Sequence, residues 1–271
     1  MLNGLYAQLL ADGRKNQAGG GLSARSVRYI HTIIHRLLKD AVRWGRLARD
    51  AADAADPPRS ASSHTEMVTW TGEETGRFLT GVRDDRLAAA FVLLATTGAR
   101  RGEVLGLRWS DVDLDAGRAA IAVHHRVQLG EPKTARGRRT IDLDAMTVIA
   151  HREHRKHQVA ERLLMGAGWT DQGLVFCRVD GGPLHPERFT RTFRDRVRQL
   201  GLPPIRLHDL RHGWATLALA RGVHPKVVQE RLGHATIGVT LDIYSRVTAR
   251  MQSDAAEQVA AATFGGADSV G

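Results

Sequence analysis

The stretch "LGHATIGVTLDIY" spans residues 232–244 and ends in one of only three tyrosines in the chain. The other two, Tyr6 and Tyr29, lie near the N-terminus. Tyr244 follows His234 by ten residues, after a run of Thr, Ile and Val. A lone tyrosine is usually a packed aromatic side chain, and that is the first interpretation of Tyr244. A chemical role needs support from the rest of the chain.

Composition narrows the class of protein. The 271 residues can form one large domain or two smaller ones, and 42% hydrophobic with 25% charged residues is ordinary for a globular protein. The net charge of +10 indicates a polyanionic partner such as DNA or RNA. Arg-rich composition also follows from a GC-rich genome, so no single arginine is informative by itself.

Several functions lack their sequence signals. Cys177 is the single cysteine, which rules out an internal disulfide and any multi-cysteine zinc site. No GxxxxGK[ST] loop is present, so nothing points to ATP. The longest apolar run, 87–95, is too short to span a membrane, and the N-terminus has no signal-peptide pattern. We therefore expect a cytoplasmic protein with no cofactor, no metal and no membrane partner.

The N-terminal part contains one strong helical pattern. Residues 23–49 have apolar residues at helical spacing and start at Ser23 or Ser26. Much of the remaining face is basic, and the candidate DNA contacts there are Arg28, Arg36, Lys39 and Arg43. Either this face is simply solvated or it lies along phosphates. Residues 53–65 are rich in Ala, Pro and Ser and are typical of a linker.

The rest of the chain is predicted to be mainly helical. Thr71 and Glu74 form a capping box that begins a helix, and a buried helix over 86–97 is expected to end at Gly98. A short helix over 99–109 follows. Residues 112–143 alternate and contain glycine turns, which predicts a small antiparallel sheet. The remainder is expected to be helical, so the fold class is mainly α with a small antiparallel β-sheet (α+β).

A later helix, 187–200, carries two stripes. Its apolar stripe is Phe189, Phe193, Val197 and Leu200. Its basic stripe, at the same spacing, is Arg188, Arg191, Arg194 and Arg198. The basic stripe is either a solvated face or a surface that tracks DNA phosphates.

Five local patterns occur in order along the chain. They are "TGARRGE" (97–103), "PKTARGRRT" (132–140), "HDLRH" (208–212), "LGH" (232–234) and Tyr244. Each pattern alone is weak, but the ordered set resembles the tyrosine recombinases, the family of phage integrases and Xer-type recombinases. The resemblance is strong over about 66–250 and weaker over 5–56.

The resemblance implies roles for individual residues. The implied catalytic residues are Arg100, Lys133, His208, Arg211, His234 and the nucleophile Tyr244. Glu103 would support the site, and His212 would be structural or supporting. The basic turn around Lys133 would add DNA contacts from Arg136, Arg138 and Arg139.

The chemistry of these side chains makes the same set plausible. An attacked phosphodiester concentrates negative charge on its non-bridging oxygens, which two arginine forks can stabilise. A tyrosine hydroxyl has a pKa near 10, so a histidine must accept its proton or hold it in line. The 5′-oxygen leaving group needs a proton, which Lys133 can supply. A phosphotyrosine ester stores the bond, so religation needs no ATP.

The resemblance also predicts the organisation of the chain and its partners. We expect a partial helical core-binding domain at 1–56, shortened at its N-terminus, a linker at 57–66, and a catalytic domain with a C-terminal helix and tail at 67–271. The partner is double-stranded DNA with attachment-type sites, and the protein associates with the nucleoid when bound. The active form would be a homotetramer on DNA, with a monomer alone in solution. Accessory DNA-bending or directionality factors belong to the same expectation.

Three other interpretations remain beside this one. A type IB topoisomerase shares the chemistry, although the motif spacing favours integrases. A truncated DNA-binding remnant or regulator without recombinase activity would keep the basic surfaces. The histidines of "HREHRKH" (151–157) could bind zinc.

Overall fold

Residues 2–14, 19–59, 68–122, 138–234, 236–238 and 240–241 are described by the structure, a computed structural model. Two units make up the chain: Met1–Glu66, called unit 1, and Met67–Gly271, called unit 2. The boundary between them falls at the end of the expected linker. The assignment of unit 1 as a core-binding domain stays a prediction.

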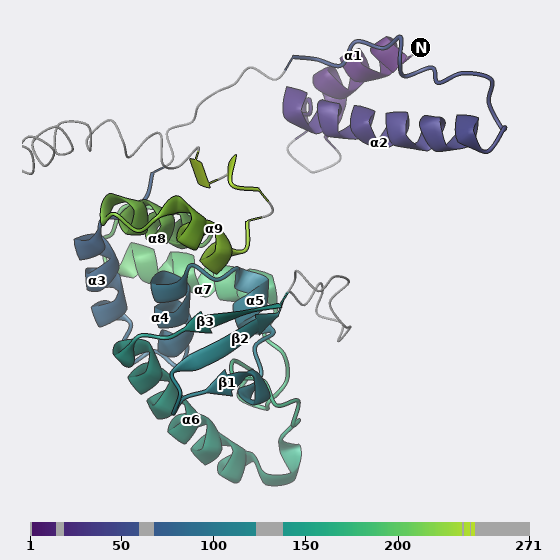
Figure 1. The fold of residues 1–271 in the computed structure, drawn as a ribbon. Coiled ribbons are helices and arrows are strands. Elements are labelled where there is room, and N and C mark those ends of the chain that lie inside the picture. The colour runs from purple at the N-terminus through teal and green to yellow at the C-terminus, as the bar shows by residue number, and fades with distance from the viewer. Residues whose placement is uncertain are drawn as a thin grey trace, which may run out of the picture. The chain divides into compact units, whose positions relative to one another are not determined.

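Unit 1 contains two packed helices, α1 (Leu2–Asp12) and α2 (Ala24–Arg43) (Figure 1). Ser23 begins α2 by accepting a hydrogen bond from the backbone N–H of Ser26, as the sequence predicts. The Tyr6 hydroxyl lies 2.8 Å from His31 Nδ1 and ties α1 to α2. The helix ends at Arg43 rather than near residue 49. Gly45 adopts a positive φ of 68°, which continues the chain as a turn.

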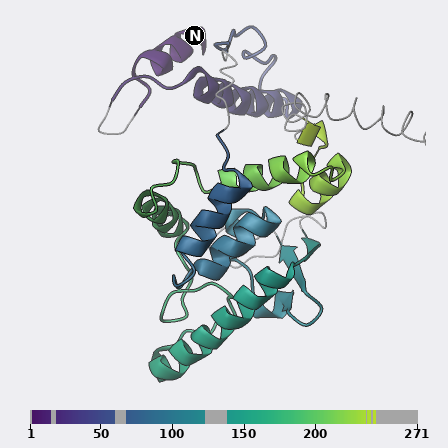
Figure 2. The same ribbon diagram turned by 90° about the vertical axis from the view of Figure 1, so that its left-hand side faces the viewer.

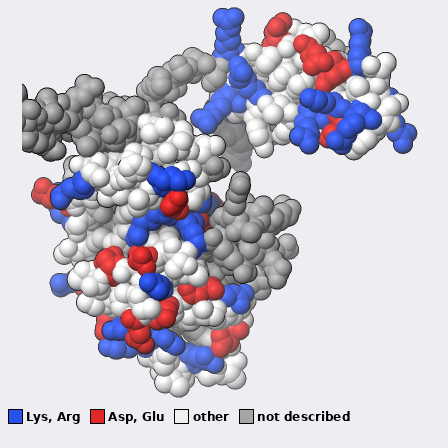
Figure 3. Space-filling model, in the orientation of Figure 1, with Lys and Arg blue, Asp and Glu red and all other residues white. Residues whose placement is uncertain are grey.

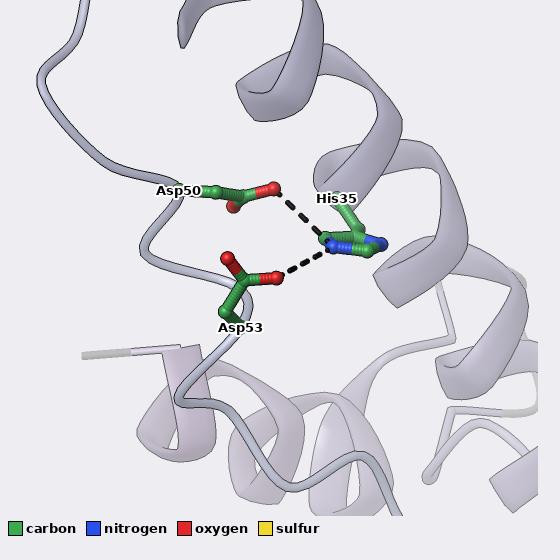
Figure 4. Close-up of side chains that lie close together, drawn as sticks. All are labelled: His35, Asp50 and Asp53. Carbon is green, nitrogen blue, oxygen red and sulfur yellow. Dashed lines mark hydrogen bonds and ion pairs between the residues drawn. The ribbon is translucent and has the colours of Figure 1, made fainter.

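The turn after α2 is fastened to that helix by a small charged cluster. His35 Nε2 lies 3.0 Å from an oxygen of Asp53 and 3.3 Å from one of Asp50 (Figure 4). Asp50 also accepts a hydrogen bond from the backbone N–H of Ala52, which stabilises the turn locally. The cluster therefore holds the end of unit 1 in place against α2.

Unit 2 is built mainly from helices, with a small sheet at one side (Figures 1 and 2). Its described helices of five residues or more are α3 (Gly72–Gly81), α4 (Ala88–Thr97), α5 (Arg101–Leu105), α6 (Ala145–Met165), α7 (Pro186–Gln199), α8 (Asp209–Ala220) and α9 (Pro225–Leu232). Two short 3₁₀ turns, η1 (Trp109–Asp111) and η3 (Gly166–Gly168), also lie among the described residues of unit 2. The two views show α4 at the centre, packed between α6 and α8.

The core of unit 2 is aromatic where α3, α4 and α7 meet. Phe78, Phe91, Phe189 and Phe193 are all at most 1% exposed, and the centroids of neighbouring rings lie 5.2–6.0 Å apart. The apolar stripe predicted on α7 is thus confirmed, and the same helix turns its arginines outward. Thr71 begins α3 with the predicted capping box.

The sheet is antiparallel, with strands β1 (Val112–Asp113), β2 (Arg118–Ala122) and β3 (Arg138–Asp142) in that order. Ala119 pairs with Ile141, and both side chains are buried. On the opposite face, Arg118 and Asp142 form an exposed ion pair at 3.2 Å. Since side chains alternate along a strand, Arg139 lies on the same face as Ile141 and turns toward the interior.

The histidines proposed as an alternative zinc site belong to the core and surface of α6. His151 Nδ1–H donates to the Thr147 carbonyl oxygen at 2.7 Å, and His154 Nε2–H donates to the Val175 carbonyl oxygen at 2.7 Å. Both are buried, whereas His157 is exposed. The three rings do not converge, so this alternative is not supported.

The predicted fold class, mainly α with a small antiparallel sheet, is confirmed. One local expectation is wrong, because the segment between η3 and α7 is not helical. It is held instead by single β-bridges, Arg108 with Leu174 and Cys177 with Pro183. None of the described helices has both the length and the apolar content needed to cross a bilayer.

Candidate active site

The first arginine pattern lies where α4 ends. Gly98 caps α4 with a φ of 65°, as predicted, and a side chain there would meet Leu232 at 2.5 Å. The end of α4 therefore packs closely against α9. Arg100 follows in extended conformation as the residue before α5. Its Nη1 donates to Glu103 Oε1 at 2.8 Å, and its Nη2 donates to the Gly233 carbonyl oxygen at 2.8 Å.

The second arginine enters from α8. Arg211 is 4% exposed, and it donates to the carbonyl oxygens of Gly98 and Leu232, both at 2.7 Å. Burial, then the charge of Arg100, lowers the pKa of Arg211 to about 9. That value is still well above neutral, so the guanidinium stays charged. Arg100 and Arg211 thus lie on the same side of unit 2, bound to the same helix end.

Glu103 is the acidic residue at the centre of these contacts. Its side chain is 1% exposed and forms ion pairs with Arg100 at 2.8 Å and Arg139 at 2.9 Å. Burial alone would raise the pKa of Glu103, but hydrogen bonds and charge from Arg139 and then Arg100 bring it below its usual value. The carboxylate therefore remains ionised and fixes both arginines.

The C-terminal end of α9 collects three arginines. The carbonyl oxygens of three successive residues, Arg231, Leu232 and Gly233, accept hydrogen bonds from Arg139, Arg211 and Arg100 in that order. Carbonyl groups at a helix end lack partners inside the helix and carry the negative end of its dipole. Cations are stabilised there, which explains why three like charges gather around one turn.

His234 directly follows this helix end. Gly233 stops α9 in the left-handed region with a φ of 65°, and His234 Nδ1 then lies 2.9 Å from the Thr240 hydroxyl. Burial, followed by the charges of Arg211 and Arg100, lowers the pKa of His234 to about 4. The ring is therefore neutral at pH 7 and has one nitrogen that can accept a proton.

The HDLRH pattern places two histidines beside each other at the start of α8. The rings of His208 and His212 lie 4.9 Å apart and nearly perpendicular. Burial, then the charges of His212 and Arg211, lowers the pKa of His208. The charge of Arg211 is felt by both His208 and His234. The predicted catalytic set has four described members, Arg100, His208, Arg211 and His234. They thus lie close enough for their charges to affect one another's pKa values.

The arginines around the α9 end form a basic patch. In Figure 3, Lys and Arg side chains lie together where α9 meets the sheet, with Asp and Glu side chains beside this patch and over the rest of the same face of unit 2. Among the charged side chains just described, Glu103 alone is acidic, and it is buried. Such an arrangement suits a phosphate group, because arginine forks match its oxygens.

Some predicted site residues lie outside the described residues. Lys133, Arg136 and Tyr244 belong to this group, and for Arg138 only the backbone of β3 is described. Their predicted roles therefore stay predictions.

The predicted DNA-contact residues separate into two kinds. Exposed side chains on α2 of unit 1 are Arg28, Arg36, Lys39 and Arg43, and on α7 of unit 2 they are Arg188, Arg191, Arg194 and Arg198. Arg139 differs, because its side chain is only 14% exposed and is bound to Glu103 and the Arg231 carbonyl oxygen. These contacts do not favour Arg139 as a phosphate contact. The strand alternation that puts Arg139 on the same face of β3 as Ile141 is the sequence signal for its inward direction.

A family model described as the phage integrase family matches residues 73–251. The chain belongs to this family. Within the phage integrase family, one relative is a "Tyrosine recombinase XerC-like" protein of Caldanaerobacter subterraneus subsp. tengcongensis. It is 27% identical over 260 residues, which cover 88% of this chain and 66% of the relative. The "ICEBs1 integrase" of Bacillus subtilis is 26% identical, covering 92% of this chain and 69% of its own length. The chain thus spans about two thirds of these relatives.

Solved structures of phage-integrase-like proteins share this fold. The Tn1549 transposon integrase in complex with a circular intermediate DNA has a TM-score of 0.67 and 21% identity, covering 83% of this chain and 76% of its own. The XerA recombinase has a TM-score of 0.58 at 20% identity, with 93% and 88% covered. At 20–21% identity, the likeness to these solved structures establishes the fold alone. The chemistry has to be argued from the residues of the site.

Proposed function

We propose that this chain is a site-specific DNA recombinase that breaks and rejoins DNA through Tyr244. The observation that carries the proposal is the set of arginines bound to the end of α9, immediately before a neutral His234. Membership of the phage integrase family gives this basic site its substrate, a DNA phosphodiester. The four described members of the catalytic set come from three segments, around Arg100, around His208 and Arg211, and around His234, whose charges act on one another.

The arginines would stabilise the transition state. Arg100 and Arg211 each use two N–H groups to fix themselves on backbone carbonyls or Glu103. A guanidinium has five N–H groups, so each retains donors for the non-bridging phosphate oxygens. Because both side chains are held before substrate arrives, they need little reorganisation during the reaction.

Proton transfers would be divided between the two sides of the phosphorus. The Tyr244 oxygen bonds to phosphorus as the bond to the 5′-oxygen breaks, which gives a 3′-phosphotyrosyl ester. A neutral His234 or His208 can accept or orient the tyrosine proton, and Lys133 would protonate the leaving 5′-oxygen. Attack by the 5′-hydroxyl of another strand reverses these steps. Strand exchange and religation then need neither a metal nor ATP.

The partners follow from the same proposal. Double-stranded DNA with attachment-type sites would be the substrate, bound by the exposed arginines of α7 and of α2. A homotetramer on DNA, formed from a monomer in solution, would pair the two recombining sites. Accessory DNA-bending or directionality factors would set the direction. The solved Tn1549 integrase, whose structure contains a circular intermediate DNA, supports the DNA partner by likeness of fold.

The alternative, a DNA-binding remnant without recombinase activity, is less well supported. A protein that only binds DNA needs exposed basic side chains, but it has no use for Arg211 buried at the end of α9 or for a histidine with a pKa of about 4. Buried charges are costly to retain.

The test is formation of a covalent adduct. Direct repeats flanking the gene would identify the attachment core, and a nicked suicide duplex carrying that core traps the phosphotyrosyl ester. Wild-type protein should give an adduct that survives denaturation, whereas Tyr244→Phe should bind the same DNA and give none. Absence of an adduct with wild-type protein on its core site, or an adduct with Tyr244→Phe, would overturn the proposal.

A further inference from the structure

Arg139 is the arginine at the α9 end that lies outside the predicted catalytic set. It is the second residue of β3 and pairs with Ile121 of β2. Its side chain leaves the sheet on the buried face and reaches two other elements. Nη1 and Nη2 donate to the two oxygens of Glu103, both at 2.9 Å, and Nε donates to the Arg231 carbonyl oxygen at 2.6 Å.

Both partners of Arg139 hold residues of the proposed catalytic set. Glu103 also accepts bonds from the side chain and backbone N–H of Arg100, at 2.8 and 2.7 Å. Arg231 lies three residues before His234 on the turn that ends α9. The guanidinium of Arg139 also packs against Gly233, where an added Cβ would lie 3.2 Å from Nη1. One side chain thus spans the gap between α5 and the end of α9.

The donors of Arg139 are directed inward rather than toward DNA. All three of its nitrogens are engaged, and the side chain is 14% exposed. A two-pronged bond to a carboxylate fixes both distance and angle, which a single point charge would not do. This geometry is suited to holding neighbours in place.

We propose that Arg139 is a positioning residue for DNA cleavage, which sets the relative placement of Arg100 and His234 by bridging Glu103 to the C-terminal end of α9. The inference rests on the proposed function, because cleavage is the step that the placement serves. Arg139 also links β3 to Glu103 and to the end of α9. In the sequence, β3 directly follows the segment that contains Lys133.

A phosphate contact and a positioning residue differ in what their removal changes: the salt dependence of DNA affinity for the first, and the cleavage rate of bound DNA for the second. If Arg139 bound a phosphate, its removal would lower the salt dependence of DNA affinity by about one unit of slope. As a positioning residue, it leaves that slope unchanged and affects the rate of cleavage of bound DNA. Misplacing a catalytic group by about 1 Å costs about a hundredfold in rate.

The experiment compares three variants with the wild-type chain at saturating suicide DNA. Arg139→Gln should lower the single-turnover rate of adduct formation about a hundredfold, and Arg139→Lys, which keeps the charge but loses the fork, about tenfold. Arg118→Gln is the matched control, since Arg118 is an exposed arginine of the same sheet. It should cleave at the wild-type rate. Thermal unfolding of each variant confirms that it is folded at the assay temperature.

A pH profile supplies a readout that a purely structural role would not move. Without Arg139, Glu103 stays buried but loses the first of the two cations that lower its pKa. The pKa of Glu103 should rise, so cleavage by Arg139→Gln should decline on acidification to about pH 5.5 more steeply than cleavage by wild type. Arg139→Lys should show an intermediate profile.

A wild-type cleavage rate in Arg139→Lys and Arg139→Gln would overturn the inference. A reduced salt slope with normal cleavage of bound DNA would also overturn it, because Arg139 would then be a phosphate contact. Ring resonances of His234, followed by NMR in the chain without DNA, should shift in Arg139→Gln and remain unchanged in Arg118→Gln.

The NMR measurement also separates this inference from the proposed function. If wild-type protein forms no adduct, the proposed function fails while the shift of His234 still tests the placement. If wild type forms the adduct and His234 does not respond to Arg139→Gln, the proposed function stands and the positioning role is wrong.

Discussion

Two sets of arginines in unit 2 differ in their surroundings: one set is bound to protein acceptors at the end of α9, and the other stands on an exposed face of α7. Arg100, Arg139 and Arg211 converge on the carbonyl groups that end α9, with Glu103 as their counter-charge. The arginines of the α7 row, Arg188, Arg191, Arg194 and Arg198, stand on an exposed face of that helix, whose opposite side carries the buried Phe189 and Phe193. The first set is fixed by protein groups before DNA arrives. The second set is exposed, with Arg198 in a surface ion pair with Asp195 at 3.2 Å, and it can follow a phosphate backbone.

The difference shows that placement decides what an arginine does. A buried guanidinium loses hydration, so it must have several protein acceptors, and these acceptors also fix its direction. An exposed guanidinium keeps its water and adds little to the stability of the fold. The two sets should therefore respond to substitution in opposite ways: the buried set in stability and rate, the exposed set in DNA affinity.

The largest effect is expected for Arg211→Gln. The shorter side chain leaves the carbonyl oxygens of Gly98 and Leu232 buried without their donor, at about 1–3 kcal/mol each. We expect the free energy of unfolding to fall by about 4 kcal/mol and adduct formation to fall by about 10²–10³-fold. Denaturant unfolding and single-turnover cleavage measure the two losses. A variant with normal stability would place Arg211 in the exposed class.

Glu103→Gln tests the counter-charge of the buried set. The amide keeps the size of the side chain but removes the charge that Arg100 and Arg139 share. Breaking a buried ion pair typically costs about 3–5 kcal/mol, and because Arg100 is 36% exposed we expect about 3 kcal/mol in the free energy of unfolding. Glu187→Gln is the control, since Glu187 pairs with Arg101 at the surface and is 71% exposed. Equal losses in both variants would contradict the comparison.

Acid provides a third test, because burial affects histidines as it affects arginines. Burial lowers the pKa of His151 from 6.5 to about 4. Since the folded pKa lies below the unfolded one, the unfolded state binds the proton more readily, and stability is lost as pH falls from about 6.5 to about 4. The loss for His151 is up to about 3 kcal/mol. His151→Phe should lack this component in denaturant unfolding, whereas His157→Gln, exposed on the same helix, should keep it.

The fold class could be predicted because its signals are local. Thr71 with Glu74 is a capping pattern that acts within one turn, and Gly98 ends α4 because the left-handed region suits glycine. The apolar stripe of α7 follows from helical spacing. The predicted end of α2, at residue 49, is wrong: the basic composition beyond Arg43 is compatible with a helix, but the helix ends at Arg43 and Gly45 continues the chain as a turn.

The site was only partly predictable, because its contacts are between distant segments. The motifs supplied Arg100, Arg211 and His234, but no local pattern shows that all three meet at the end of α9. The sequence predicts Arg139 as a DNA contact together with Arg136 and Arg138, since composition treats neighbouring arginines alike. Its inward direction follows from the alternation of side chains along β3, but its pairing with Glu103 joins residues 36 positions apart and has no local signal.

The smallest effect is expected for the exposed set. Arg191 lies in the middle of the α7 row, with an exposed side chain, so Arg191→Gln should change the free energy of unfolding by less than about 0.5 kcal/mol. If it contacts a phosphate, the slope of log affinity against log salt should decrease by about one unit, since one counterion fewer is released on binding. Cleavage of DNA at saturation should be unchanged, because Arg191 is not among the arginines bound to α9. Titration of a labelled duplex at several salt concentrations measures the slope, with Arg83→Gln, an exposed arginine at the end of α3, as the control. A wild-type slope in Arg191→Gln would mean that the α7 row is a solvated face, and DNA would then have to be held by other basic surfaces.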